Sequence, residues 1–492
     1  LPYLLLLTLP LLAIFGAYLV NTYQNNFLLL FFIIVIACVV ALVAFDRLPR
    51  NAYPVAIVMI GLSLLLHTAL ISSQLSGYDI HFEYYFQNLV LQNGYWNFTI
   101  PHNYNTSVSV VLLCPIYSLV LNMDAIWIFK IIYPLVFCLV PLALFYIYRK
   151  QIGAKKAFLS AFFFMGIFTF FIQMLALARQ QIAELFFALL ILLLIDRKLA
   201  LNQRATLAII FAISLIMSHY ALGYICLFFL LVGWAIVALI RSRAGKRAWG
   251  WLTYKFGGLP QSLTSQGVFP HKIMAVIIGI YLVFAFGWYG GIAQGTALNT
   301  IRHIGQSQYS LFATEPSQPP GQPSQPPGQP SQLPLGMEKL TYSALGFDFP
   351  SAPGVGKGFR IFQYLTELFI VVGFFRLILK PKGFKFKSEY IALTIVAALI
   401  LLACIVIPRF SAYLTVSRFY HISLFLLAPL CILGGEAIWQ GASRLFRSVS
   451  PQLKLRKGFA PQLSLVSSNT TPLIFVGLAV LIPYFLFSSG FV

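Results

Sequence analysis

Residues 27–45 read FLLLFFIIVIACVVALVAF, a run without a charged side chain. A helix of about 20 apolar residues crosses the roughly 30 Å hydrocarbon core of a bilayer. Similar runs recur along the whole chain, which is 60% hydrophobic and only 9% charged. They lack the alternating apolar and polar residues of an outer-membrane barrel. The sequence therefore predicts an all-α, polytopic transmembrane helical bundle.

We expect about thirteen spans, at residues 2–20, 27–45, 54–72, 126–147, 157–175, 178–196, 205–219, 221–240, 272–290, 363–379, 390–407, 411–438 and 472–489. They divide the chain into five parts: N-terminal helices (1–75), an outer loop with juxtamembrane helices (76–125), central helices (126–290), a second outer loop (291–362) and C-terminal helices (363–492). The chain opens on Leu1 inside an apolar run, as a fragment or a trimmed chain would. The six cysteines all lie in apolar segments without a CxxC spacing, which indicates buried apolar residues rather than disulfides or a metal site.

Basic residues cluster in alternate loops, which hold 23 of the 33 Lys and Arg: 46–53, 148–156, 197–204, 241–255, 380–387 and 444–457. The positive-inside rule makes these loops, and the N-terminus of this chain, cytoplasmic. A fourteenth apolar segment, 106–122, would invert every later loop if it crossed, so we expect it to be interfacial or re-entrant. The net charge of +21 then reports the topology and attracts anionic membrane lipids. We predict no nucleic-acid partner from it.

The two long loops on the extracytoplasmic side differ in composition. Loop 291–362 contains two copies of a Pro/Gln-rich heptad, at 316–322 and 323–329, which predicts a polyproline-like linker without a catalytic role. Segment 76–105 has no Lys or Arg, two acids, two histidines and nine aromatic residues. The first outer loop is therefore the place to look for chemistry.

Asp79, Glu83 and Gln87 fall on one stripe of a helix expected from about 79 to 92. Two carboxylates on one face can act as a base and its partner, or can hold a metal ion, and the sequence leaves open whether a divalent metal takes part. Alternatively, Asp79 only caps the helix and Glu83 only faces lipid headgroups. With no Lys or Arg in its loop, we expect Asp79 to be partly desolvated and hence more basic. His81 is expected to line the same cavity as a polar residue.

Two further clusters approach the same face. The outer end of the sixth span carries Arg179, Gln180 and Glu184, and the seventh span ends at His219. Together these residues indicate the lining of a cavity. The alternatives are that Arg179 merely extends to the membrane surface and that His219 is merely a hydrogen-bonded interface residue. Arg409 lies at a turn, and Arg418 and His421 are expected two to three turns down the next span. A guanidinium at that depth needs an anionic partner, and its planar fork suits a phosphate.

These features together resemble the GT-C superfamily of membrane glycosyltransferases, which use polyprenyl-phosphate-linked sugars. More closely, residues 77–86, 178–184 and 217–220, which read GYDIHFEYYF, ARQQIAE and MSHY, are similar to an uncharacterised family of large prokaryotic membrane proteins of GT-C character, over about 54–240 and more weakly around Arg418. The resemblance implies a polyprenyl-phosphate sugar donor and a glycan, lipid or protein acceptor. It implies that Asp79 is the general base, that Glu83 assists it or helps to hold a metal, and that Arg418, with Arg409 or Arg179, holds the donor phosphate.

Two other classes of function compete with this hypothesis. A transporter or flippase of a lipid-linked glycan predicts ionisable residues near the bilayer midplane and an internal repeat of spans. We find no repeat beyond the Pro/Gln heptads, and the polar residues lie toward the outer face. A non-catalytic scaffold of a surface assembly would leave the three clusters without a role.

Overall fold

The computed structural model describes residues 2–245, 269–296, 345–379, 386–407, 410–411, 414–449 and 471–491, with a few isolated residues between them. The two Pro/Gln heptads and Arg409 lie outside the described residues, so the predictions for them stay predictions. The described part of the chain contains helices and no strand, as expected for an all-α protein.

The helices of the first half are α1 (Pro2–Tyr23), α2 (Phe27–Ala44), η1 (Arg50–Ala52), α3 (Tyr53–Ala69), α4 (Asp79–Asn93), α5 (Val108–Val111), α6 (Leu113–Leu121), α7 (Ala125–Trp127), η2 (Ile128–Ile132), α8 (Tyr133–Phe137), α9 (Leu139–Ile152), α10 (Ala154–Met165), α11 (Phe168–Phe171), η3 (Gln173–Ala176), α12 (Ala178–Ile195), α13 (Leu201–Ser218) and α14 (Tyr220–Arg241). The second half contributes α16 (His271–Phe286), η6 (Gly287–Ile292), η7 (Phe349–Ser351), α19 (Gly354–Leu379), α20 (Ser388–Val406), α21 (Val416–Val449), α22 (Thr471–Ile474), η11 (Phe475–Leu481) and α23 (Ile482–Ser488).

Within the described residues, eleven helices are long and apolar enough to cross a membrane, or twelve if the bent pair α10 and α11–η3 is one span. The pair bends by 63° because the helix breaks at Gly166 and Ile167, where Ile167 is extended. The thirteenth predicted span is present as the shorter apolar helix Pro472–Ser488. Segment 106–122 forms the short helices α5 and α6, a second shorter apolar stretch at Val108–Leu121, so its interfacial or re-entrant placement stays a prediction. The chain is therefore a multi-pass helical membrane protein.

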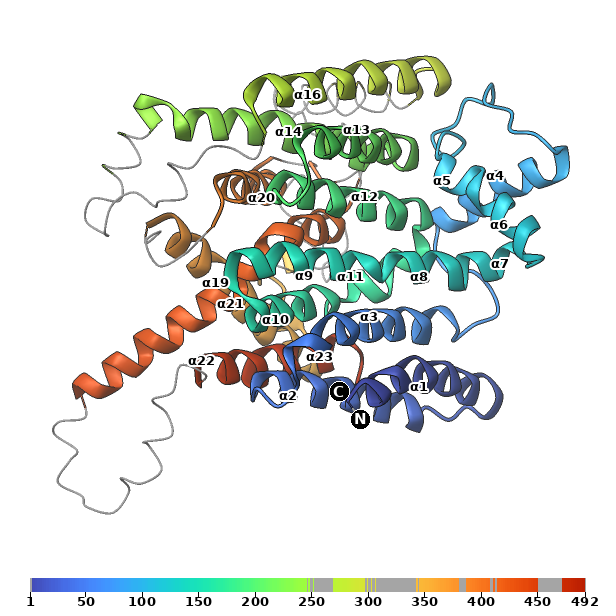
Figure 1. The fold of residues 1–492 in the computed structure, drawn as a ribbon. Coiled ribbons are helices and arrows are strands. Elements are labelled where there is room, and N and C mark those ends of the chain that lie inside the picture. The colour runs from blue at the N-terminus through green and yellow to red at the C-terminus, as the bar shows by residue number, and fades with distance from the viewer. Residues whose placement is uncertain are drawn as a thin grey trace, which may run out of the picture.

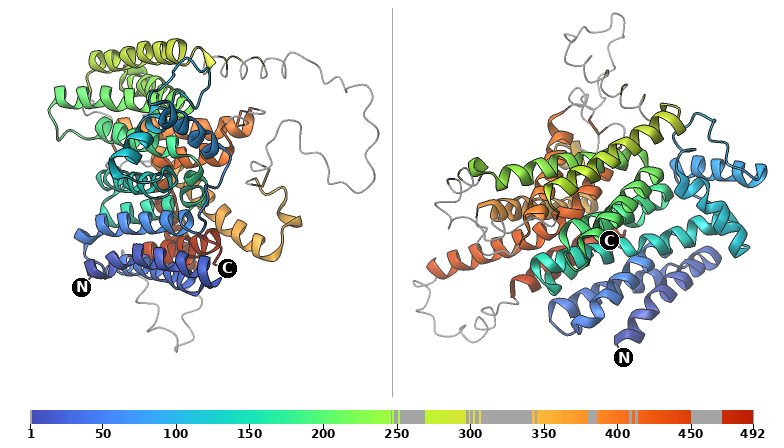
Figure 2. Two further views of the ribbon diagram at one scale, coloured as in Figure 1. Left: turned by 90° about the vertical axis from the view of Figure 1, so that its right-hand side faces the viewer. Right: turned by 45° about the horizontal axis from the view of Figure 1, so that its top comes forward.

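The long helices run side by side, and the short helices α4, α5 and α6 lie together at one end of the bundle (Figure 1). We call this end the α4 end. The first and last parts of the chain meet, because α2 packs against α22, η11 and α23, and both termini lie at the same side of the bundle (Figure 2).

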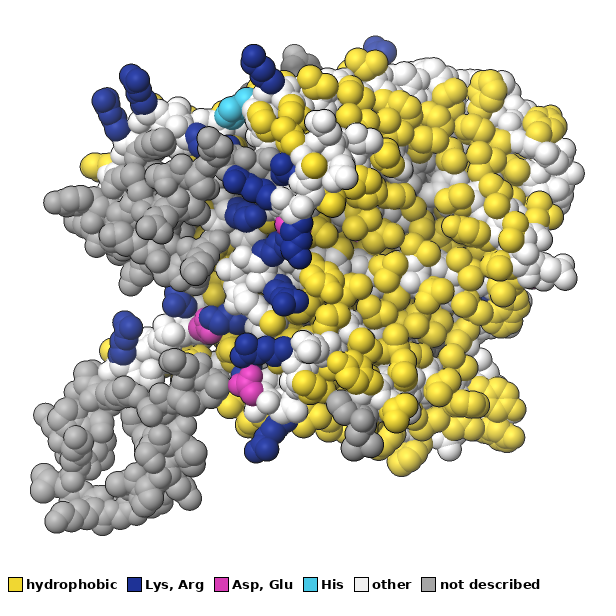
Figure 3. Space-filling model, in the orientation of Figure 1, with side chains coloured by type: hydrophobic (Ala, Val, Ile, Leu, Met, Phe, Trp, Pro, Cys, Tyr) yellow, Lys and Arg dark blue, Asp and Glu magenta, His cyan; other side chains and the backbone are white. Residues whose placement is uncertain are grey.

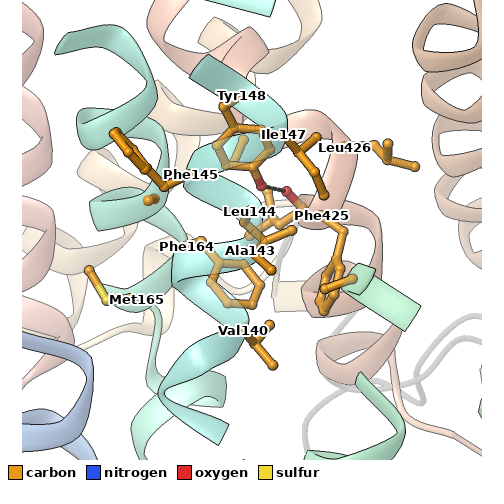
Figure 4. Close-up of a cluster of buried hydrophobic side chains, with 14 of the residues drawn as sticks. Val140, Ala143, Leu144, Phe145, Ile147, Tyr148, Phe164, Met165, Phe425 and Leu426 are labelled. Atoms are coloured by element: carbon orange, nitrogen blue, oxygen red, sulfur yellow. Dashed lines mark hydrogen bonds between the residues drawn. The ribbon is translucent and has the colours of Figure 1, made fainter. Parts of the chain in front are cut away.

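The main core draws buried side chains from most of the long helices. In the part where α9, α10 and α21 meet, aromatic and aliphatic side chains fill the space between the helices (Figure 4). Phe164 of α10 meets Phe425 of α21 edge to face, with ring centroids 5.3 Å apart. The hydroxyl of Tyr148 donates to the carbonyl of Leu424 over 2.9 Å, so this buried polar group is satisfied across the helix interface. The contact fixes α9 against α21.

Glycines allow α19 and α21 to cross closely. A Cβ atom on Gly434 would lie 1.8 Å from the carbonyl oxygen of Phe369, and one on Gly373 would lie 2.1 Å from the carbonyl oxygen of Leu430. Small residues at such crossings are typical of packing between membrane helices, where backbones must approach to gain van der Waals contact. The crossing holds α21 in the middle of the bundle.

A separate small core supports the α4 end. Its buried residues come from α4, α5, α6, α7, η2, α8 and α12: Ile80, Val110, Cys114, Ala125, Ile128, Phe129, Tyr133, Ala178 and Ile182. The ammonium of Lys130 donates to the carbonyls of Ala69 and Ser72, over 2.7 and 2.6 Å. Lys130 thereby satisfies the free carbonyls where α3 ends and the first outer loop begins.

The opposite end of the bundle, which we call the basic end, carries the described parts of the six basic loops. Figure 3 shows Lys and Arg side chains gathered there, while the rest of this face is largely hydrophobic. The predicted segregation of the basic loops from the first outer loop is therefore seen along the bundle axis (Figures 1 and 3).

Candidate functional site

Gly77 brings the start of α4 against η3, the short helix before α12. Its φ of +119° lies in a region that favours glycine, and a Cβ atom there would lie 2.3 Å from the Cβ of Ala176. Asp79 is the first residue of α4, and Tyr78 precedes it at the cap position without a side-chain capping bond. The capping interpretation of Asp79 is therefore wrong, and its carboxylate is directed elsewhere.

The carboxylate of Asp79 is shared by three partners. Oδ2 lies 3.2 Å from an Nη2 donor of Arg418 and 3.4 Å from an Nη2 donor of Arg179, and Oδ1 accepts from the hydroxyl of Tyr104 over 2.9 Å. The guanidinium of Arg179 also lies over the Tyr104 ring, 3.9 Å from its centroid. The expectation that Asp79 has no cation beside it is thus wrong. Arg179 and Arg418, which lie 100 and 339 positions further along the chain, both approach its carboxylate.

Glu83 lies one turn further along α4 and is fully buried. Its Oε2 accepts the backbone N–H of Ala178, the first residue of α12, over 2.9 Å, and its Oε1 lies 3.2 Å from Nε of Arg179. Burial raises the pKa of Glu83 to about 8, although Arg179 and the N–H of Ala178 oppose the rise. Glu83 therefore anchors α4 to the N-terminus of α12, where a free backbone N–H favours a carboxylate oxygen.

A second polar layer lies beneath the first. Glu184 accepts from Nε2 of Gln180 over 2.9 Å through Oε1, and its Oε2 lies 2.9 Å from Nε2 of His421. All three side chains have no exposed surface. The predicted cavity residues of α12 and α21 thus contact one another directly.

His219 sits between α13 and α14 with its ring stacked on Tyr220, 5.6 Å between centroids. Tyr220 in turn lies under the Arg179 guanidinium at 5.5 Å. Nδ1 of His219 accepts the N–H of Leu222 over 3.0 Å, so a neutral ring carries its proton on Nε2. Within the described structure, this buried Nε2 has no hydrogen-bond partner. His219 therefore belongs to the same cluster.

The predicted residue His81 is exposed on α4 and is not part of the cluster. Arg409 lies outside the described residues, so its predicted role stays a prediction. Arg418 is also placed differently from the prediction. Because α21 begins at Val416 rather than near residue 411, Arg418 lies in its first turn instead of two to three turns down the span.

Tyr104 is a site residue that the sequence did not single out. It is one of nine aromatic residues in segment 76–105, and nothing in its neighbours marks it. Its ring stacks on Phe82 and on His102, with centroids 5.2 and 5.3 Å away, which fixes the hydroxyl toward Asp79. Burial raises the pKa of Tyr104, so the hydroxyl keeps its proton and remains a donor.

The two carboxylates of α4 do not fit a divalent metal ion. Both pair with Arg179, whose positive charge takes the place that a cation would need between them. Across the described residues, no three His, Cys, Asp or Glu side chains form a group that could hold a metal. The arrangement is suited to an anion instead.

Access to the site is uneven. The side chain of Arg418 is 21% exposed and that of Asp79 is 14% exposed, whereas Arg179 is only 3% exposed. A ligand can therefore reach Asp79 and Arg418 directly, with Arg179 supplying positive charge from behind. A partly buried carboxylate that can accept a proton thus lies beside two guanidiniums that can bind a phosphate.

Solved structures similar to this chain include the archaeal oligosaccharyltransferase AglB from Archaeoglobus fulgidus in complex with an inhibitory peptide and a dolichol-phosphate, at 13% identity and a TM-score of 0.49. Another is the apo form of the Archaeoglobus fulgidus oligosaccharyltransferase, at 14% identity and a TM-score of 0.47. Each match covers 91% of this chain and 56% of the other, so the chain spans little more than half the length of these enzymes. No curated protein matches the chain significantly in sequence.

A family described as "Predicted membrane protein (DUF2206)" matches residues 204–322 and 356–492, just over half of the chain. The matched part lies further toward the C-terminus than the expected similarity over about 54–240, and it includes His219, Arg418 and His421. The expected likeness to an uncharacterised membrane-protein family is confirmed, and the chain belongs to the DUF2206 family of predicted membrane proteins.

Proposed function

We propose that this protein is a GT-C-type glycosyltransferase that moves a sugar from a polyprenyl-phosphate donor to a glycan, lipid or protein acceptor. The observation that carries the proposal is the convergence of Arg179 and Arg418 on the accessible carboxylate of Asp79. It joins an acid that can take a proton to two guanidiniums that can hold a phosphate, at the edge of an apolar bundle where a prenyl chain is soluble.

The donor phosphate would compete with Asp79 for Arg418. A phosphate offers more charge and more acceptor oxygens than a carboxylate, and the guanidinium fork binds it with two parallel hydrogen bonds. Once Arg418 turns to the phosphate, Oδ2 of Asp79 loses one of its two cationic partners. Oδ2 is then available to the acceptor hydroxyl, while Tyr104 still donates to Oδ1.

In the transfer step, the acceptor hydroxyl oxygen forms a bond to the anomeric carbon of the donor sugar, and its proton passes to Asp79. The bond between the anomeric carbon and the phosphate oxygen breaks, and its electron pair stays on that oxygen. Arg418 stabilises the added negative charge directly, and the buried Arg179 does so at longer range. Fixed donors of this kind, aimed at developing charge, are usually the largest contribution to catalysis.

The position of the site in the membrane follows from the charge distribution. The six basic loops lie at the basic end and the cluster lies at the α4 end (Figures 1 and 3). Under the positive-inside rule, the basic end faces the cytoplasm, so transfer takes place on the extracytoplasmic face of the cell membrane.

The decisive experiment measures sugar transfer from a polyprenyl-phosphate donor by the purified protein and its Asp79→Asn variant, alongside thermal stability. We expect a folded variant whose turnover falls by roughly 10²–10⁴, the usual contribution of general base catalysis. Asn keeps the volume of the side chain and still accepts from Tyr104. Normal transfer by Asp79→Asn would remove the assigned base.

A transporter or flippase of a lipid-linked glycan is the second candidate, favoured by one observation. Glu184 and His421 form a fully buried ionisable pair between two spans, as residues on a proton or substrate pathway do. Reconstituted vesicles distinguish the two functions: a flippase moves the lipid-linked glycan across the bilayer without an acceptor, whereas a transferase requires the acceptor and releases polyprenyl phosphate.

A further inference from the structure

The second polar layer has no part in the proposed transfer step. Gln180, Glu184 and His421 are fully buried, and none of them reaches Asp79 through a recorded hydrogen bond. The Glu184 carboxylate is the centre of this layer, because one oxygen accepts from Gln180 of its own helix and the other contacts His421 of α21. Glu184 thereby links α12 to α21.

The link lies close to both guanidiniums along the chain. On α12, Arg179 directly precedes Gln180, which is the residue that orients Glu184. On α21, Arg418 lies three residues before His421, so the two side chains point to the same side of the helix. Any change in the spacing of the two helices at Glu184 therefore moves Arg179 and Arg418 relative to one another.

The layer is poorly arranged for stability alone. Burial of a carboxylate and an imidazole costs hydration that a pair of apolar residues would not lose. Among the atoms that the structure describes, Nδ1 of His421 and Oε1 of Gln180 are buried without a hydrogen-bond partner. What the contact supplies is a fixed distance and orientation between two helices at one height.

We propose that Glu184 is a positioning residue, which holds α12 and α21 at the spacing where Arg179 and Arg418 converge on one anion, and so sets the affinity for the donor phosphate. The inference rests on the proposed function for the identity of the anion. The geometry on which it depends, the contacts of Glu184 with Gln180 and His421, is independent of that function.

The kinetic test compares Glu184→Ala and Glu184→Gln with a matched control, Glu436→Ala. Glu436 is a buried acid on the same helix as His421, but it pairs with Lys156 at the basic end over 2.8 Å. Because misplacement of a binding group by about 1 Å can cost up to about 100-fold, we expect Glu184→Ala to raise the KM for the donor roughly tenfold or more. The kcat at saturating donor should also fall, because the same arginines stabilise the negative charge that develops on the phosphate oxygen.

Glu184→Gln keeps the shape of the side chain and one hydrogen bond, so its donor KM should lie between those of the wild type and Glu184→Ala. Glu436→Ala should lower the Tm but leave the donor KM unchanged. If the donor KM of both Glu184 variants equals that of the wild type, or rises equally in Glu436→Ala, the positioning role is wrong. Where Glu184→Ala does not fold, Glu184→Gln decides by the same criterion.

A double-mutant cycle on Tm tests the positioning without any donor. If Glu184 positions the two arginines against Asp79, the Tm losses of Glu184→Gln and Asp79→Asn should not add, because each weakens the same set of contacts. The losses of Glu436→Ala and Asp79→Asn should add. Additive losses in both pairs would overturn the inference, whereas absence of sugar transfer by the wild-type protein would overturn only the proposed function.

Discussion

The two ends of the bundle both carry ion pairs, but they use them differently. At the basic end, Lys155 pairs with Asp46 over 2.6 Å and Arg241 pairs with Glu389 over 2.9 Å, and the side chain of Asp46 is 41% exposed. At the α4 end, one oxygen of Asp79 faces two guanidiniums, and Glu83 is fully buried beside one of them.

The difference separates structural ion pairs from a site. The pairs at the basic end join helix ends across loops. Where one partner is exposed, as Asp46 is, such a pair typically contributes about 0–1 kcal/mol. At the α4 end, a charge without a full set of partners is costly because the cluster is largely buried. Placing two guanidiniums against one carboxylate oxygen therefore costs free energy, and stability alone does not explain it. A ligand that competes for one arginine would explain it.

The largest effect is expected from a test of whether the two ends of the bundle face opposite sides of the membrane. In a Cys38→Ala background, we expect Asn93→Cys at the end of α4 to react with an impermeant thiol reagent added to intact cells, and Ala244→Cys to be protected. Both positions are exposed in the structure, so accessibility differs only by side. Labelling of both cysteines from one side would overturn the topology and the site assignment together.

Replacing Arg418 tests whether a guanidinium at the α4 end binds substrate. We expect Arg418→Lys to raise the donor KM roughly tenfold, because an ammonium cannot form the bidentate contact, and Arg418→Ala to raise it roughly 100-fold. Arg360→Lys is the matched control, since Arg360 is 20% exposed and pairs with Asp348 outside the cluster. Equal donor KM values for Arg418→Ala and the wild type would leave Arg418 as a simple membrane anchor.

The sequence predicted the elements of the site better than its connections. The apolar runs predicted the helices. The predicted stripe of Asp79, Glu83 and Gln87 lies on one face of α4, and Glu83 and Gln87 on it are buried. The Arg179 and Arg418 motifs were also expected at one face of the membrane. These features are local, because helical periodicity and bilayer thickness act on short stretches of chain.

The contacts that make the cluster a site were not predictable in this way. Counting charges loop by loop left Asp79 without a cation, because its arginines come from α12 and α21. Tyr104 was one aromatic residue among several, and its role depends on the fold of segment 94–107 over α4. The break at Gly166 and Ile167, which sets the entry to α12, likewise depends on tertiary packing rather than on apolar content.

The pH dependence of stability should have opposite signs at the two ends. Burial raises the pKa of Glu83 to about 8 from an ordinary value of 4.5, so the folded state holds a proton that the unfolded chain releases. Its contribution to stability is therefore complete below about pH 4.5 and is lost as the pH rises through about 8. The Tm of the wild-type protein should fall between pH 5 and 8, and Glu83→Gln should flatten that fall.

Asp196 at the basic end provides the control. Burial raises its pKa, but the hydrogen bond and the charge of Lys150 outweigh burial and hold the pKa below the ordinary value of 3.8. Its contribution to stability is lost only as the pH falls through that lowered pKa, so Asp196→Asn should keep the wild-type slope between pH 5 and 8. An unchanged slope in Glu83→Gln would show that Glu83 is ionised in the folded protein.

The smallest effect is expected from Asp46→Asn. Asp46 follows α2 with a φ of +57°, a left-handed conformation that Asn adopts as readily as Asp, so the substitution removes the charge without straining the backbone. The lost contact with Lys155 should lower the free energy of unfolding by about 0–1 kcal/mol, and less at high salt, because the carboxylate is largely in water. Sugar transfer should be unchanged, since no contact joins this pair to the Asp79 cluster in the described structure. A tenfold loss of transfer in Asp46→Asn at unchanged Tm would mean that ion pairs at the basic end also serve the reaction, and the distinction between the two ends would fail.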